Sequence, residues 1–216
     1  MIVGSIGYDD IETPIETGSD VLGGSAVHAG VSSSFHLPAT PEGIRRVGLV
    51  APIGRDFSNS HQSKLEDLGI DFSGVEKLPG KTFRWSGRYS GTMENVETIS
   101  TEVNVLGDFS PKIPESWRSP NVLFCANTHP ASQILVLDQC PSSEITAIDT
   151  FMLWIETEFE SLSTALRKAD LAILNEEEVC AISGEDFFMK AIGPILSGEC
   201  LHGGKSAGSG PSGLII

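Results

Sequence analysis

Aspartates and glycines follow two apolar segments near the start of the chain. We expect Asp9 and Asp10 directly after the strand that begins with "MIVGSI", and "GRD", residues 54–56, after the strand that begins with "IRRVGLV". Between them, "LGGSAVHAG" contains the adjacent glycines Gly23 and Gly24. Carboxylates accept hydrogen bonds from hydroxyl groups, so together these loops could bind a polyol. A structural interpretation of the glycines stays open, because two glycines also suit a tight turn into a closely packed helix.

A second polar group lies in "ILNEEEV", where Asn175 and Glu178 are three positions apart at the expected start of a helix. Asn175 suits a helix N-cap, and an acidic first turn suits the helix dipole. Alternatively, the two side chains share one face of the helix start and could organise water around a magnesium ion bound to phosphates. Both interpretations fit the sequence.

The glycine- and serine-rich segment at residues 196–216 contains two motif fragments. "GKS" ends like a P-loop, but the first glycine of that motif would fall on Glu199. Residues 204–208 match G-x-S-x-G. Both motifs need a preceding strand and a following helix, and neither is expected here. We therefore predict that both matches are accidental and that the segment is a flexible tail.

Elsewhere, short apolar runs alternate with amphipathic segments. "MIVGSI", "IRRVGLV", "NVLFCAN", "EITAIDT" and "ADLAILN" are typical of strands, with helical segments between most of them. This alternation predicts an α/β fold with a mostly parallel sheet flanked by helices. Residues 81–109 break the pattern, since polar and apolar residues alternate there as in two or three antiparallel strands. We expect this part to form a small β lid that could cover a cleft.

Composition excludes several classes of function. Fourteen Lys and Arg residues stand against 29 Asp and Glu residues, a net charge of −15. Such a chain would be repelled by nucleic acid and by anionic membranes, so neither is an expected partner. The four cysteines and five histidines are scattered without metal-ligand spacing, which indicates reduced thiols and no zinc site. No basic segment precedes the first apolar residues, so we expect a cytoplasmic protein.

Several segments in order resemble the ribokinase-like, PfkB-type family of sugar and nucleoside kinases. They are "GSIGYDDIETP", "LGGSAVHAG", "RRVGLVAPIGRDF", "LEDLGIDFSGV", "GKTFRWSGRY", "AIDT" and "ADLAILNEEEVCAISG". The resemblance covers about residues 1–197 and implies a partial Rossmann-like α/β domain whose β lid comprises about residues 11–22 and 81–109. It also implies transfer of the γ-phosphate of ATP, with Mg²⁺, to a hydroxyl of a sugar or nucleoside. In this family lids often pair between subunits, so the resemblance allows a homodimer through the lid, and the choice between dimer and monomer stays open.

The resemblance assigns substrate-binding roles to five residues. Asp9 matches the family's aspartate that binds a substrate hydroxyl, and Gly23 and Gly24 match its substrate-side diglycine. Asp149 matches a residue that lines the cleft. His28 stands where many relatives carry an asparagine that binds substrate, so the identity of the substrate stays open.

The same resemblance matches Asn175 and Glu178 to the N-x-x-E motif, which supports magnesium and phosphate without direct metal ligation. The family's "GAGD" loop, with its catalytic aspartate and its backbone anion hole, is absent from the sequence. Loss of a positioned base costs roughly 10²–10⁴ in rate, so we expect a kinase by ancestry with little or no activity. Alternatives are a non-catalytic binding protein and a decayed fragment. We predict that residues 198–216 are a non-family tail, from truncation or a frameshift after about Leu196.

Overall fold

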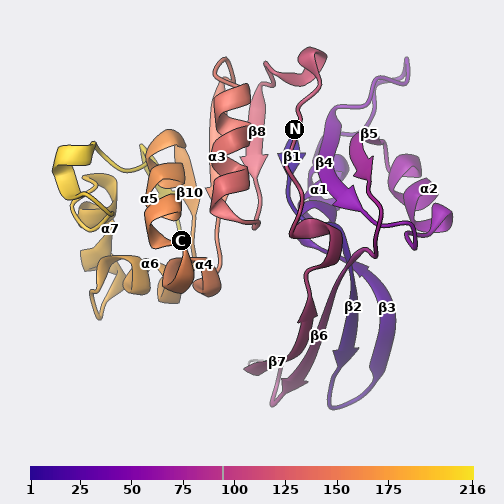
Figure 1. Cartoon of the computed structure of the whole chain (residues 1–216), viewed down its shortest axis with the longest axis horizontal. Helices are drawn as coiled ribbons and strands as arrows, with labels where there is room; N and C mark the ends of the chain where they lie inside the picture. Colours follow the sequence, from indigo (N-terminus) through magenta and orange to yellow (C-terminus); the bar gives the residue numbers. More distant parts are fainter. Residues whose placement is uncertain (94) are drawn as a thin grey trace. The chain divides into compact units, whose positions relative to one another are not determined.

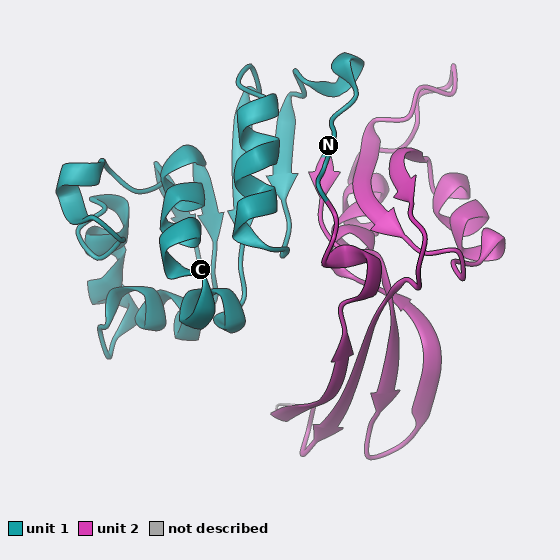
Figure 2. Cartoon of the chain, viewed as in Figure 1, with its two compact units in different colours: residues 1, 110–216 teal, residues 2–109 magenta. Residues whose placement is uncertain are grey.

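A computed structural model describes residues 1–93 and 95–216 (Figure 1). Glu94, which belongs to the expected lid, lies outside the described residues. The chain forms two compact units: unit 1 is Met1 with residues 110–216, and unit 2 is residues 2–109 (Figure 2). Each unit is described by itself.

Unit 2 contains a parallel sheet in the order β1-β4-β5 and two helices that pack on it. These elements are β1 (Ile2–Val3), β4 (Val47–Ile53), β5 (Ile70–Lys77), α1 (Ser25–His36) and α2 (Asn59–Asp67). The β4 strand is apolar and almost wholly buried, as a strand covered on both faces should be. Gly69, with a φ of 82°, follows the end of α2 in the left-handed conformation that commonly ends a helix.

A second, smaller sheet in unit 2 has the order β3-β2-β6-β7. Its strands are β2 (Gly7–Glu12), β3 (Thr17–Gly23), β6 (Phe83–Ser90) and β7 (Asn95–Glu102), and the short helix η1 (Asn104–Leu106) follows them. The β6 and β7 strands are antiparallel, which confirms the strands expected between residues 81 and 109. Asp9 and Asp10 lie inside β2 of this small sheet. The prediction that they directly follow the first strand of the parallel sheet is therefore wrong.

Unit 1 is built on parallel strands in the order β11-β10-β9-β8. They are β8 (Val122–Cys125), β9 (Ile145–Asp149), β10 (Leu171–Ile173) and β11 (Gly213–Ile215). The helices are η2 (Glu115–Trp117), α3 (Pro130–Gln139), α4 (Met152–Thr157), α5 (Phe159–Lys168), α6 (Glu176–Ser183) and α7 (Phe188–Leu196). The α3 helix packs against α5, and α6 packs against α7.

The glycine- and serine-rich segment is ordered, and the prediction of a flexible tail is wrong. It contains the short helix η3 (Gly204–Ala207) and β11, which pairs in parallel with β10. The guanidinium group of Arg167 on α5 donates to four carbonyl oxygens in the segment, and Leu201 is buried. This order comes from tertiary hydrogen bonds, which leave no apolar period in the sequence.

The mostly parallel strands, the flanking helices and the separate small sheet confirm the predicted α/β class. Over residues 1–93 and 95–216, no helix is long and apolar enough to cross a membrane. The four cysteines, all within that part, are free thiols.

Candidate functional site

The residues expected to bind substrate in unit 2 gather around Asp9 on β2. Gly7 pairs with Gly23 across β2 and β3, and alternation along β2 places Asp9 on the same face as Gly7. A side chain at Gly23 would overlap the Asp9 carboxylate. Glycine is therefore required at this position if the carboxylate is to keep its place.

Gly24 forms the turn from β3 into α1. Its φ of 102° disfavours any L side chain, and a Cβ there would clash with the carbonyl oxygen of Ser5. The backbone N–H of Ala26 donates to that same carbonyl oxygen at 2.9 Å, and Ser5 and Ser25 exchange backbone-to-hydroxyl hydrogen bonds of 3.0 Å. The structural interpretation of the diglycine is thus supported, and the turn also brings the start of α1 to Asp9.

His28, in the first turn of α1, is exposed, and its charge acts on Asp9. Burial raises the pKa of the Asp9 carboxyl; His28 opposes this shift and Asp10 adds to it. The structure therefore brings Asp9, Gly23, Gly24 and His28 together. The result is a partly buried carboxylate that is well suited to accept hydrogen bonds from hydroxyl groups.

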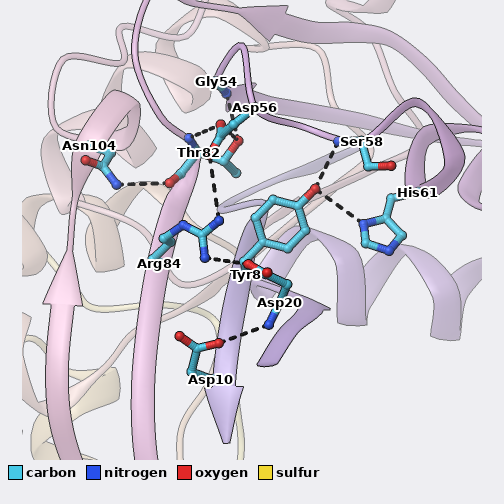
Figure 3. A network of polar contacts seen from close by, with 10 residues as sticks. All are labelled: Tyr8, Asp10, Asp20, Gly54, Asp56, Ser58, His61, Thr82, Arg84 and Asn104. Carbon is cyan, nitrogen blue, oxygen red and sulfur yellow. Dashed lines mark hydrogen bonds and ion pairs between the residues drawn. The ribbon is translucent and has the colours of Figure 1, made fainter. Parts of the chain in front are cut away.

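Asp10 is engaged elsewhere, on the other face of the small sheet. Its Oδ1 accepts a 2.9 Å hydrogen bond from the backbone N–H of Asp20, which has a left-handed φ of 54° (Figure 3). Arg84 on β6 donates to Asp20 Oδ1 at 2.6 Å, and its guanidinium group lies 5.1 Å from the centre of the Tyr8 ring. Asp10 thus holds Asp20 in place for Arg84.

Asp56, in the loop after β4, fastens the beginning of β6. Its Oδ1 accepts hydrogen bonds from the backbone N–H of Thr82 at 2.7 Å and from the Thr82 hydroxyl at 2.8 Å (Figure 3). Burial opposes ionisation, but the Thr82 hydrogen bonds and the charge of Arg84 outweigh it and lower the pKa of Asp56. The prediction that Asp10 and Asp56 join Asp9 in binding a polyol is therefore not supported by their contacts.

Unit 1 brings together the other three expected residues. Asp149 ends β9, and Asn175 and Glu178 follow the neighbouring parallel strand β10. Asn175 Oδ1 accepts from the Glu178 N–H at 2.8 Å, and Glu178 Oε2 accepts from the Asn175 N–H at 3.0 Å. This is a complete capping box, so the N-cap interpretation is confirmed.

Both carboxyl groups of this trio are costly to ionise. Burial raises the pKa of Glu178, which is 5% exposed; its hydrogen bond from the Asn175 backbone opposes the shift, and the charge of Asp149 adds to it. Burial also raises the pKa of Asp149, against hydrogen bonds from the backbones of Thr150 and Asn127. A cation beside them would relieve both penalties.

Gln133 on α3 has a role that the sequence pattern does not predict. It is fully buried, and its Nε2 donates to the carbonyl oxygens of Cys125 at 3.3 Å, Ala126 at 3.2 Å and Asp149 at 2.8 Å. One amide thus joins the ends of β8 and β9 and fixes the backbone of Asp149. The only available signal was a glutamine inside the apolar helix "PASQILVLDQ".

Solved structures share this arrangement of elements. A ribokinase from Giardia lamblia matches with a TM-score of 0.68 at 17% identity, over 88% of this chain and 63% of that one. The chain has a ribokinase-like fold. A nucleoside kinase from Burkholderia thailandensis in complex with inosine matches this fold with a TM-score of 0.66 at 13% identity, over 85% and 62% of the two chains. A PfkB protein from Polaromonas sp. JS666 gives 0.64 at 16%, over 88% and 70%.

No family model and no curated protein matches the sequence. The chain spans less than two thirds of the ribokinase and nucleoside kinase structures, at 63% and 62% of their lengths. The likeness therefore establishes the ribokinase-like fold.

Two carboxyl groups of unit 1 have the chemistry to hold a magnesium ion through water. Asp149 and Glu178 offer the hard oxygen atoms that Mg²⁺ prefers, and Mg²⁺ usually keeps several waters and needs only one or two carboxylates. No cluster of three or more His, Cys, Asp or Glu side chains able to hold a metal occurs in residues 1–93 and 95–216.

Proposed function

We propose that this chain binds a small hydroxylated molecule, a sugar or a nucleoside, through Asp9 in unit 2. The observation that carries the proposal is the partly buried Asp9 carboxylate, whose surroundings are kept open by Gly23 and connected by Gly24 to α1. Burial has already removed part of the water around this carboxylate. A hydroxyl group that replaces the remaining water therefore gains a charge-assisted hydrogen bond.

By this proposal the chain is a sugar or nucleoside kinase by ancestry, with little or no phosphoryl transfer as it stands. Asn175 and Glu178 would support Mg²⁺ through water, Asp149 would line the cleft beside them, and ATP would supply the phosphoryl group. The sequence lacks the aspartate that would take the proton from the substrate hydroxyl, so the expected rate is low. The second candidate is a non-catalytic sugar- or nucleoside-binding protein, which would use the same Asp9 carboxylate without phosphoryl transfer.

Calorimetric titration with D-ribose and adenosine at pH 7 tests the binding. Asp9→Asn keeps the size of the side chain but removes its charge, so affinity should fall about 10- to 150-fold, the equivalent of about 1.5–3 kcal/mol for a hydrogen bond to a charged group. Asp67→Asn, an exposed aspartate of α2, is the matched control and should bind as the wild type does. No binding by the wild type, or equal binding by Asp9→Asn, would refute the proposal.

ADP release separates the two candidates. With ATP, Mg²⁺ and a saturating ligand, sustained ADP formation that disappears in Asp9→Asn supports the kinase. Binding without ADP formation supports the binding protein.

We also propose that the chain forms a homodimer through the small sheet. We further propose that it works in the cytoplasm and has no nucleic-acid or membrane partner. Val96 and Ile99 on β7 are each 51% exposed, so a second copy could cover them. Light scattering after size-exclusion chromatography should give twice the mass of one chain for the wild type. The Val96→Glu variant should give the mass of a single chain. A wild-type chain that stays monomeric at high concentration would refute the dimer.

A further inference from the structure

Trp85 on β6 is the neighbour of Asp9 across the small sheet. The parallel pairing of β2 with β6 places Asp9 opposite Trp85, so both side chains project from the same face. Alternation along β6 places Gly87 and Tyr89 on that face too. The face therefore continues from a carboxylate to two aromatic rings.

The indole ring of Trp85 is held in one orientation. Its six-membered ring lies where a side chain at Gly87 would project, so glycine is needed beneath it. The indole Nε1 donates to the hydroxyl of Thr98 on β7 at 3.3 Å, and the Tyr89 ring meets the indole edge-on at a centroid distance of 6.4 Å. Trp85 remains partly exposed, so a fixed aromatic surface is open to a ligand.

The charged side chains of β6 lie on the opposite face. Arg84 is paired with Asp20 at 2.6 Å and with Asp56 at 3.8 Å, and Arg88 is paired with Glu12 at 3.0 Å. These arginines are separated from Asp9 by the sheet. The face of Asp9 and Trp85 thus combines a hydrogen-bond acceptor with an aromatic ring, and neither arginine is there to attract an anionic ligand.

We propose that Trp85 stacks on the ring of the ligand whose hydroxyl group binds Asp9. This inference rests on the proposed function and narrows it to uncharged ligands with a closed ring, furanose, pyranose or nucleoside, in preference to open-chain polyols. A sugar ring has an apolar C–H face and a nucleobase has a π face, and a fixed indole can contact either. An open-chain polyol offers the same hydroxyl groups to Asp9 but no face to the indole.

Tryptophan fluorescence gives a direct test. The Trp117→Phe/Trp154→Phe double variant leaves Trp85 as the only tryptophan, since the chain contains three. D-Ribose and adenosine should change its emission on saturation. Ribitol carries the hydroxyl groups of ribose on an open chain. In calorimetry it should bind at least about fivefold more weakly than D-ribose, taking the low end of what base–aromatic stacking contributes as the scale.

Two substitutions complete the test. Trp85→Leu should weaken adenosine binding about five- to 100-fold, and Trp85→Phe should recover much of it, because a phenyl ring still stacks. Thermal unfolding of both variants identifies any general loss of structure, and a fold-related effect would lower ribitol and adenosine binding alike.

The outcomes distinguish the inference from the function on which it rests. Ribitol binding as tight as that of ribose, or full adenosine affinity in Trp85→Leu, overturns the stacking role and leaves Asp9 binding in place. Loss of ligand binding in Trp85→Phe equal to that in Trp85→Leu, with both variants folded, also overturns it. Absence of any binding by the wild type overturns both proposals.

Discussion

Replacing Arg167 should release the segment at residues 198–216 from α5. The Nη2 atom of Arg167 donates to the carbonyl oxygens of Gly198 at 3.3 Å, His202 at 3.2 Å and Gly204 at 2.8 Å, and Nε donates to that of Ala207 at 3.3 Å. Arg167→Met keeps much of the aliphatic stem and removes every donor.

The expected cost follows from these contacts. Nη2 has two hydrogens for three carbonyls, so the four contacts amount to fewer than four full hydrogen bonds. A net hydrogen bond to a charged group contributes about 1.5–3 kcal/mol, and the freed carbonyls regain some water. We expect Arg167→Met to lower the free energy of unfolding by about 2–4 kcal/mol. For a chain of this size, each 1 kcal/mol lowers Tm by about 2–4 °C.

Urea unfolding measures the total, and hydrogen exchange read by mass spectrometry locates it. Exchange should accelerate in peptides from residues 198–216, including β11, and change little in unit 2. Lys168→Met is the matched control: Lys168 is the next residue and forms an exposed 2.6 Å ion pair with Asp138, which is expected to contribute no more than about 1 kcal/mol. Equal stabilities for the two variants, or unchanged exchange at 198–216 in Arg167→Met, would refute the reasoning.

Three further substitutions test the sites. Gly24→Ala should cost about 2–4 kcal/mol in urea unfolding, from its φ of 102° and the clash with Ser5; Gly43→Ala, with a φ of 83° and open space, should cost only about 1–2. Asp56→Asn should be less stable than wild type at pH 7, and the gap should close as pH falls through the lowered pKa of Asp56, since the charged form is the stabilising one. Glu178→Gln should be at least as stable as wild type at pH 7, because the raised pKa means that ionisation costs stability. In thermal unfolding against pH, the difference should shrink as pH falls below that raised pKa and vanish only below the ordinary pKa of glutamate in the unfolded chain. Two results would contradict these assignments: a stability difference between Asp56→Asn and wild type that grows in acid, or a Glu178→Gln variant that is much less stable than wild type at pH 7.

Contacts between near neighbours in the chain could be predicted from the sequence. The Asn175–Glu178 capping box spans three residues, and the Gly23–Gly24 turn depends on what glycine alone allows. The alternation of apolar and amphipathic segments likewise indicated the α/β class, because burial of each element leaves a local period.

The environment of Asp9 depended on contacts that the sequence does not show. Asp9 and Asp10 are adjacent acidic residues, and only the pairing of β2 with β6, 76 residues away at Asp9 and Trp85, decides which of them faces the indole. A shift of one residue in that register would exchange them. A separate long-range contact decided the role of Asp56, which the sequence suggested as a polyol ligand: its carboxylate instead accepts a hydrogen bond from the backbone of Thr82.

The sequence by itself determined the class of fold and offered the turn into α1 and the cap of α6 as one of two interpretations each, because all three depend on residues within a few positions of one another. Only the tertiary structure decided that the glycine-rich segment is ordered and that Asp9 and Trp85 share a face. Both depend on backbone hydrogen bonds between distant segments, and backbone groups are the same in every residue except proline. The sequence therefore carries no periodic signal of where those bonds form.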